Sequence, residues 1–376
     1  MNETSARNLT LKRTVQFLGI LALTLLALEF CARLIISFYQ PDEGLPLAIR
    51  KKYLIIEGKH LRDSNSIVAF LGNSLIYMNV YPELMSARFR QNGIPIDTVS
   101  LAAPSASPGI EASLLNALVK KGAHPKLAIY NVSPWQMVTH AKNFKLDTPF
   151  YNSYLYQCEI SKPKQWGKTL ACQLKKTFYI DRYRSFFKSL LVEELFDRLS
   201  KPEKMNWNDH WQREEYVHAE ISNAGWGPSY KIVPDEKTLL SFREKRNFEF
   251  SEPAENAESG AASLHPLARP DFMPVVDVCR KNNIPLVLLI PPSYYKLNDP
   301  KQADTRVHLM KLLNRFAQSQ PDLYVIDLAF TDHNILHYYD DAHQNAYGAV
   351  DTTNQIAEVL LPVYQHLILE TKTENK

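Results

Sequence analysis

Short apolar runs alternate with longer amphipathic segments over much of the chain. The runs suit buried parallel strands, whose two faces are both covered, and they lie at residues 67–71, 98–102, 127–132, 285–290 and 323–328. The intervening and following segments have helical spacing, at residues 81–91, 109–121, 270–282, 304–318 and 345–369. Strands that alternate with helices predict an α/β domain with a doubly wound parallel sheet in three layers.

This alternation stops between residues 134 and 265. The stretch contains a helical pattern at 183–199 and turns polar and rich in Ala, Glu and Ser at 251–263, which is typical of a flexible loop. Excursions of this length are usually lids or substrate platforms, although a helical subdomain that only packs beside the sheet is the alternative. We therefore assign residues 66–133 and 266–376 to the α/β domain, and 134–265 to a large, mostly helical insertion. The insertion holds all five tryptophans: Trp135, Trp166, Trp207, Trp211 and Trp226.

The N-terminal segment is a long apolar run, residues 14–39. A helix needs about 20 apolar residues to cross a bilayer, and this run reaches that length only if Glu29 and Arg33, four residues apart, pair with each other. A cleaved signal peptide is the rival interpretation, but no small-x-small cleavage site precedes the end of the run. The sequence thus predicts a cytoplasmic tail and transmembrane anchor at 1–39, followed by a linker at 40–65.

The charges beside this run bear on orientation. Basic residues before it favour a single-pass protein of the inner (cytoplasmic) membrane, with the following domain facing the periplasm or the cell exterior. Arg50, Lys51 and Lys52 follow the run and oppose that orientation. In an exported domain Cys158 and Cys172 could form a disulfide, whereas two buried free thiols are equally compatible with the sequence.

The overall composition limits the partners and cofactors. The net charge is only +3, and the 43 basic residues are dispersed along the chain, which argues against nucleic acid as a partner. The chain has only 12 glycines and no glycine-rich loop to cradle a phosphate, so we expect no cofactor.

Two distant segments carry the candidate chemistry. Ser74 follows the first apolar run, two residues after Gly72, and Asp340 precedes His343 by three residues near the end of the chain. A serine hydroxyl needs a base to become a nucleophile, and an imidazole needs a partner that fixes its tautomer. Ser74, His343 and Asp340 supply these three roles, provided that the fold brings them together.

The expected sheet topology brings more polar groups to the same place. Ser74, the segment 100–107, Asn131 and the segment 340–343 all follow the carboxyl ends of expected strands, where open parallel sheets form their sites. The backbone of Ser74, the turn that contains Ser105 and the amide of Asn131 could donate to a developing oxyanion. Asn73, Ser105 and Asn131 are therefore the candidates for oxyanion or substrate binding.

These residues resemble the motifs of the SGNH (GDSL-like) hydrolase superfamily. Its Gly-Asp-Ser block is similar to Gly72-Asn73-Ser74, and its Asp-x-x-His block, with a following Asn, is similar to residues 340–345, which selects Asp340 rather than Asp341. The oxyanion glycine of the family would fall in residues 102–107, which contain no glycine, and its Gly-x-Asn-Asp block is represented by residues 130–133. The resemblance covers about residues 66–133 and 266–370, and within the superfamily it points to the membrane-anchored branch that includes the D-alanyl transfer protein of teichoic acid synthesis and alginate O-acetylation proteins.

The resemblance implies an SGNH/flavodoxin-like fold and an esterase or O-acyltransferase. Its substrate would be an acylated glycan or lipid of the cell envelope, and a membrane-bound acyltransferase could be its partner. The alternative is a membrane-tethered binding or assembly component that keeps the fold without catalysis.

Simpler interpretations exist for the same residues. Ser74 could be a helix N-cap, and Asp340 or Asp341 could cap the terminal helix. A metal site is the other rival, because His333 and His337 have the i, i+4 spacing of a helical metal pair close to Asp340, Asp341 and His343. The glutamate of the His-Glu-x-x-His motif is missing, so we expect no metal.

Overall fold

The computed structural model describes residues 3–38, 44–58, 66–132, 166–189, 226, 272–294, 300–329, 331–332, 334–340 and 343–374. The chain divides into two compact units. The smaller unit comprises residues 1–41 and 146–206, and the larger unit comprises residues 42–145 and 207–376.

The larger unit is built on a five-stranded parallel sheet with the strand order β2-β1-β3-β4-β5. Each strand overlaps one of the predicted apolar runs, so the parallel α/β fold is confirmed, whereas the three-layer doubly wound arrangement stays a prediction. The strands are β1 (Ile67–Leu71), β2 (Asp97–Ser100), β3 (Pro125–Asn131), β4 (Leu286–Ile290) and β5 (Leu323–Asp327).

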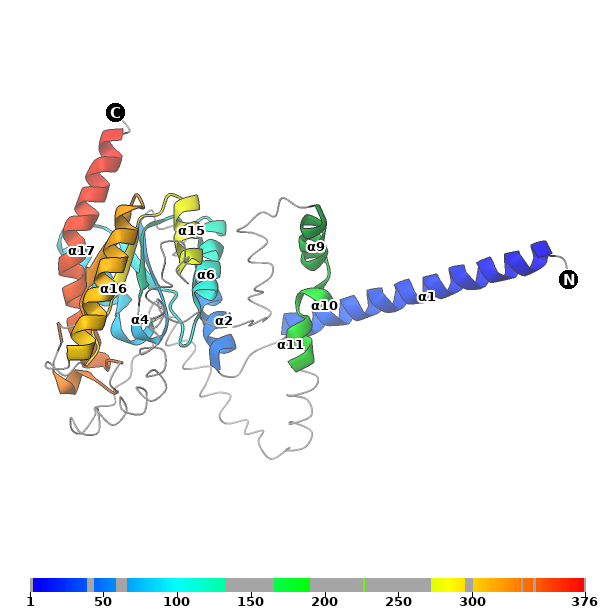
Figure 1. Ribbon diagram of the computed structural model, residues 1–376, viewed down its shortest axis with the longest axis horizontal. Helices are drawn as coiled ribbons and strands as arrows, with labels where there is room; N and C mark the ends of the chain where they lie inside the picture. The colour runs from blue at the N-terminus through cyan, green and yellow to red at the C-terminus, as the bar shows by residue number, and fades with distance from the viewer. Residues whose placement is uncertain are drawn as a thin grey trace. The chain divides into compact units, whose positions relative to one another are not determined.

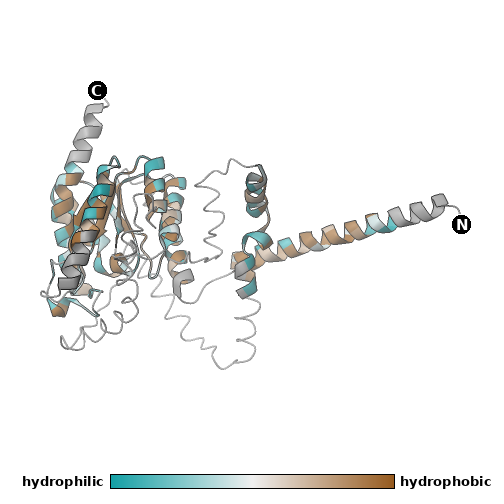
Figure 2. Cartoon of the chain, viewed as in Figure 1, coloured by the Kyte–Doolittle hydropathy of each residue, from teal (hydrophilic) through white to brown (hydrophobic). Residues whose placement is uncertain are grey.

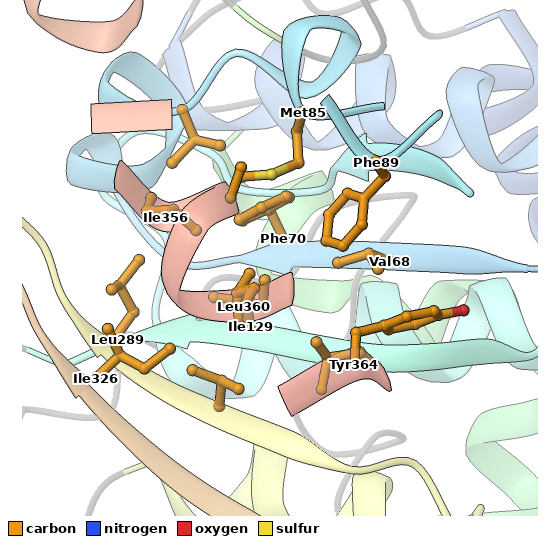
Figure 3. Close-up of a cluster of buried hydrophobic side chains, with 14 of the residues drawn as sticks. Val68, Phe70, Met85, Phe89, Ile129, Leu289, Ile326, Ile356, Leu360 and Tyr364 are labelled. Atoms are coloured by element: carbon orange, nitrogen blue, oxygen red, sulfur yellow. The ribbon is translucent and has the colours of Figure 1, made fainter. Parts of the chain in front are cut away.

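Helices flank the sheet (Figure 1), and the apolar side chains of its strands are buried. On one face, Val68 and Phe70 of β1 pack with Phe89 and with Leu360 and Tyr364, as Figure 3 shows. Along β1, β3 and β4 the alternation of side chains places every second residue in this cluster: Val68 and Phe70, Leu127 and Ile129, and Val287 and Leu289. The helices of the larger unit are α2 (Gly44–Glu57), α4 (Ser74–Asn79), α5 (Pro82–Gln91), α6 (Pro108–Lys120), α15 (Met273–Lys281), α16 (Pro300–Gln318) and α17 (Ala346–Glu374), with a 3₁₀ turn, η3 (Ile335–His337).

Helix α2 lies in the range that the sequence predicted as a linker. Ile49, Ile55 and Ile56 are buried, and α2 packs against α6, so this part of the chain belongs to the domain. Lys52, one of the three basic residues that follow the apolar run, is fully buried too.

The smaller unit contains α1 (Glu3–Phe38), α9 (Trp166–Thr177), α10 (Tyr179–Arg182) and α11 (Arg184–Ser189). Residues 12–38 of α1 are long and apolar enough to cross a membrane, by length and composition, and Figure 2 shows the apolar residues along this helix. Glu29 Oε1 accepts a hydrogen bond from Arg33 Nε at 2.9 Å, so the expected pair is present.

The insertion and the cysteines are described in part. The predicted helix at 183–199 overlaps α11, and its later residues lie outside the described part of the chain, whereas α9 was not expected from the sequence. Cys172 is disulfide-bonded, which excludes a free thiol there, while Cys31 and Cys279 are free. Cys158 lies outside the described residues.

Candidate active site

Ser74 begins α4 directly after a turn that only glycine fits. Gly72 has φ of +142°, and a Cβ at this position would lie 1.9 Å from Asn131 Oδ1. Asn73 caps α4, because its side-chain oxygen accepts a hydrogen bond from the Leu75 N–H at 3.0 Å. The interpretation of Ser74 as the helix N-cap is therefore wrong, and its hydroxyl has another partner.

That partner is His343, 269 residues further along the chain. Ser74 Oγ lies 2.7 Å from His343 Nε2. On the other side of the ring, Nδ1 lies 2.8 Å and 2.9 Å from the two carboxylate oxygens of Asp340. An aspartate that accepts the Nδ1 proton holds the tautomer in which Nε2 can accept a proton from the serine. The structure thus brings the three predicted residues together in the predicted order.

The backbone around Asp340 fixes this geometry. Asp340 is 5% exposed, and it also accepts the backbone N–H of His343 at 2.8 Å. Capping of α17 falls to Asn345, whose side-chain oxygen accepts the N–H groups of Tyr347 and Gly348 at 3.0 Å and 3.2 Å. The interpretation of Asp340 as the cap of the terminal helix is therefore wrong.

A second aspartate–histidine pair supports the same loop. Asp332 accepts a hydrogen bond from His337 Nδ1 at 3.0 Å and another from Gln344 Nε2 at 2.7 Å. The backbone N–H of Gln344, next to His343, donates to Asn79 Oδ1 on α4 at 3.0 Å. This network joins the loop that carries His343 to α4, which begins with Ser74. It therefore positions the imidazole against the serine hydroxyl.

The metal alternative has little support in the described residues. His337 and His343 each bind a separate carboxylate, at 3.0 Å and 2.8 Å. Within the described ranges, no three His, Cys, Asp or Glu side chains are grouped as a metal site would require. His333 and Asp341 of the predicted set lie outside those ranges.

Asn131 lies beside the serine turn at the end of β3. Its Oδ1 accepts the backbone N–H of Asn73 at 2.9 Å, and this donor fixes which end of the amide is oxygen. Its Nδ2 is buried and has no acceptor among the described residues. A buried amide that uses only its oxygen is costly, and functional sites are where such groups are found.

The other two oxyanion candidates have different surroundings. The side chain of Asn73 is occupied by its cap hydrogen bond, so only its backbone meets Asn131. Ser105 is exposed and has φ of +59° in a turn closed by the hydrogen bond from the Ala106 N–H to the Ala103 carbonyl at 3.0 Å. The Ala103 N–H in turn donates to the Gly72 carbonyl at 3.0 Å, which ties the Ser105 turn to the serine turn.

An acidic side chain that the sequence did not reveal lies beneath these turns. Glu111 of α6 is fully buried, and neither of its carboxylate oxygens has a hydrogen-bond partner among the described residues. Burial raises the pKa of Glu111 well above the ordinary value. The polar backbone at Gly72 and Ala103 and the positive charge of Lys52 favour the ionised carboxylate and so lower the pKa, but burial outweighs them. Lys52 is itself fully buried, with its ammonium 4.9 Å from the centre of the Tyr77 ring.

One tryptophan of the predicted insertion belongs to the surroundings of α4. Trp226 stacks on Tyr81 with the ring centroids 4.0 Å apart, and its Nε1 donates to the Met78 carbonyl at 3.2 Å. It is 5% exposed and packs with Ala346 and Ala349 of α17. This ring is therefore a packing residue, unlike the ligand-stacking ring that an aromatic substrate platform would need.

The larger unit is thus a parallel α/β domain in which a serine, a histidine and an aspartate are hydrogen-bonded in series. No protein-family model matches the chain, and no curated protein matches it. The case for a function rests on the geometry of the site.

Proposed function

We propose that the protein is a membrane-anchored serine esterase or O-acyltransferase of the SGNH type, which acts on acyl esters of a cell-envelope glycan or lipid. The observation that carries the proposal is the distance of 2.7 Å between Ser74 Oγ and His343 Nε2. This is the hydrogen-bonding range in which a general base takes a proton from a nucleophile. The contact of Asp340 with the opposite ring nitrogen supplies the orientation that such a base needs.

The chemistry follows from these positions. Ser74 Oγ attacks the carbonyl carbon of the ester while its proton passes to His343 Nε2. The tetrahedral intermediate collapses, the alcohol leaves with that proton, and the acyl group stays on Ser74 as an ester. A second hydroxyl then attacks the acyl-serine with His343 again as base, the acyl–Oγ bond breaks, and Ser74 Oγ takes the proton back from His343 Nε2. Water as the attacking group gives hydrolysis, and a glycan or lipid hydroxyl gives transfer.

The negative charge of the tetrahedral intermediate needs donors, and Asn131 is the best supported. Its Nδ2 is buried and unpaired among the described residues, beside the turn that presents Ser74. The backbone N–H groups of Ser74 and of the Ser105 turn would complete the site. Ser105 adopts the left-handed conformation that glycine takes without strain, in the segment where the family has its oxyanion glycine.

The anchor and the family resemblance suggest the substrate class. An enzyme tethered by α1 would work at a membrane surface, where acylated envelope polymers are made and modified. We propose that the α/β domain faces the periplasm or the cell exterior and that a membrane-bound acyltransferase is its partner. Neither a cofactor nor nucleic acid enters this mechanism.

The test is acyl release by the full-length protein in membranes, with activated acetyl esters and O-acetylated glycans as substrates. We expect the wild type to release acetate, and the Ser74→Ala variant to lose the activity because no acyl-serine can form. Ser86→Ala is the matched control, since Ser86 is a buried serine on α5 whose hydroxyl is hydrogen-bonded to the side chain and the backbone N–H of Thr98. Equal activity in the wild type and in Ser74→Ala would refute the mechanism and favour a non-catalytic assembly component.

A further inference from the structure

Helix α9 exposes its apolar side and buries a cysteine, Cys172, on the opposite side. Trp166, Leu170 and Leu174 follow each other at intervals of four residues and are 80%, 43% and 46% exposed. Phe178, 45% exposed, continues the stripe, because its N–H bonds to the Leu174 carbonyl at 2.8 Å. Side chains four residues apart drift by about 40° around a helix, so the four form one continuous face.

Cys172 marks the side of α9 that faces the protein. Cys172 is 7% exposed and disulfide-bonded, and it lies away from the apolar stripe on the helix surface. A helix on the surface of a water-soluble domain usually has the opposite arrangement, with its apolar face inward. The apolar stripe of α9, defined as Trp166, Leu170, Leu174 and Phe178, therefore faces an apolar medium or an apolar partner.

The position of α9 within the smaller unit identifies that medium. The backbone N–H groups of Tyr179 and Ile180, immediately after the stripe, donate to the Glu29 carboxylate at 2.9 Å and 3.3 Å. Arg33 Nη2 donates to the Thr177 carbonyl at 2.7 Å, and its guanidinium lies 4.4 Å from the centre of the Tyr179 ring. Glu29 and Arg33, which lie in the last third of α1, thus hold the junction of α9 and α10 near the C-terminal end of the apolar segment.

Orientation and charge agree with this position. Figure 1 shows α9 running across the direction of α1, so a membrane crossed by α1 would have α9 along its surface. Helix α9 contains three lysines, Lys168, Lys175 and Lys176, and no acidic residue. Exposed Trp, Leu and Phe beside lysines are the composition of helices that lie in the headgroup region of anionic membranes.

We propose that α9 is an interfacial membrane helix, which lies in the headgroup region with its apolar stripe toward the acyl chains. The lipid bilayer is the occupant of this face, and the Glu29–Arg33 pair in the last third of α1 sets the height of α9. The inference rests on the proposed anchoring by α1 and is independent of the Ser74 chemistry. It would give the tethered protein a second contact with the membrane.

The test uses a fluorescent label at single cysteines of the full-length protein in vesicles of phosphatidylethanolamine and phosphatidylglycerol. The exposed Cys31 is first replaced by Ala, Cys172 is disulfide-bonded, and burial raises the pKa of Cys279 to about 12, which keeps that thiol unreactive. Labels are placed by Leu170→Cys in the stripe, by Lys168→Cys on the exposed remainder of α9, and by Leu25→Cys in α1.

The quenching pattern separates the outcomes. We expect doxyl-labelled lipids to quench positions 25 and 170, and aqueous iodide to quench position 168. Position 25 in lipid with position 170 open to iodide would overturn the interfacial helix and leave the anchor intact. A label at 170 shielded from both quenchers would mean that protein covers the stripe, which also overturns the proposal. Exposure of position 25 to iodide would overturn the membrane anchor itself. Acyl release by Ser74 is measured separately on the same vesicles, so a failure of the catalytic proposal is distinguished from a failure of the membrane proposal.

Discussion

The amide of Asn131 gives the sharpest prediction about the proposed oxyanion site. The two polar atoms of the amide differ in their hydrogen bonding: Oδ1 accepts the Asn73 N–H at 2.9 Å, and Nδ2 has no acceptor among the described residues. Asn131→Ala removes both ends at once. Loss of the acceptor should lower stability, and loss of the donor should lower the rate, so the two effects can be measured separately in one variant.

The magnitudes follow from the two groups. The orphaned, buried Asn73 N–H should cost about 1–3 kcal/mol of unfolding free energy, measured by urea denaturation. A missing oxyanion donor should lower kcat about 10²–10³-fold, which corresponds to roughly 2.7–4 kcal/mol of transition-state stabilisation. The assay is hydrolysis of an activated acetyl ester at a temperature where the variant stays folded.

Ser86→Ala is the matched control for this experiment. Ser86 Oγ accepts the buried N–H of Thr98 at 2.9 Å, so its removal also orphans a buried backbone donor, but away from Ser74. We expect a similar loss of stability and a kcat close to that of the wild type. If Asn131→Ala loses stability but keeps its kcat within about threefold of the control, Asn131 stabilises no oxyanion and the reasoning from its free Nδ2 is wrong.

Three further predictions concern the surrounding residues. Asp340→Asn should lower kcat about 10³–10⁴-fold with little change in KM for the activated ester, because His343 loses the partner that holds its tautomer. Gly72→Ala should lower unfolding free energy by roughly 1–3 kcal/mol in urea titrations, since φ is +142° and the new methyl group would meet Asn131 Oδ1. Burial raises the pKa of Glu111, so the folded protein should keep a proton on this carboxyl that the unfolded chain releases above about pH 4.5. The free energy of unfolding of the wild type should therefore fall as the pH rises from about 4.5 toward the folded-state pKa. Glu111→Gln cannot ionise, and urea titrations at about pH 5 and about pH 8 should show that this fall is missing.

The sheet could be predicted because its strands are buried on both faces and appear as apolar runs. Helix α2 could not, since Arg50, Lys51 and Lys52 interrupt its apolar positions and give the segment the composition of a linker. Only the tertiary contact with α6 shows that Lys52 is inside the domain. The signal for α9 was present, in the four-residue spacing of Trp166, Leu170 and Leu174, but the strongly mixed composition of the surrounding insertion hid it.

The same distinction applies to the candidate site. Ser74, Asp340 and His343 could be selected from the sequence because each residue type has a chemical role and each follows an expected strand. Asp332 and Gln344, which hold the loop, act through contacts that exist only after folding. Glu111 looks like an ordinary polar residue of an amphipathic helix, and only its full burial under the serine turn distinguishes it.

Covalent labelling of Ser74 by a fluorophosphonate in native membranes tests the central claim most directly. The probe reacts with a serine whose proton is taken by a neighbouring base, and peptide mass mapping identifies the modified residue. We predict an adduct on Ser74 of the wild type and a large loss of labelling rate in His343→Ala. An unmodified Ser74 in the folded, membrane-bound wild type, or equal labelling rates in the wild type and His343→Ala, would contradict an activated serine.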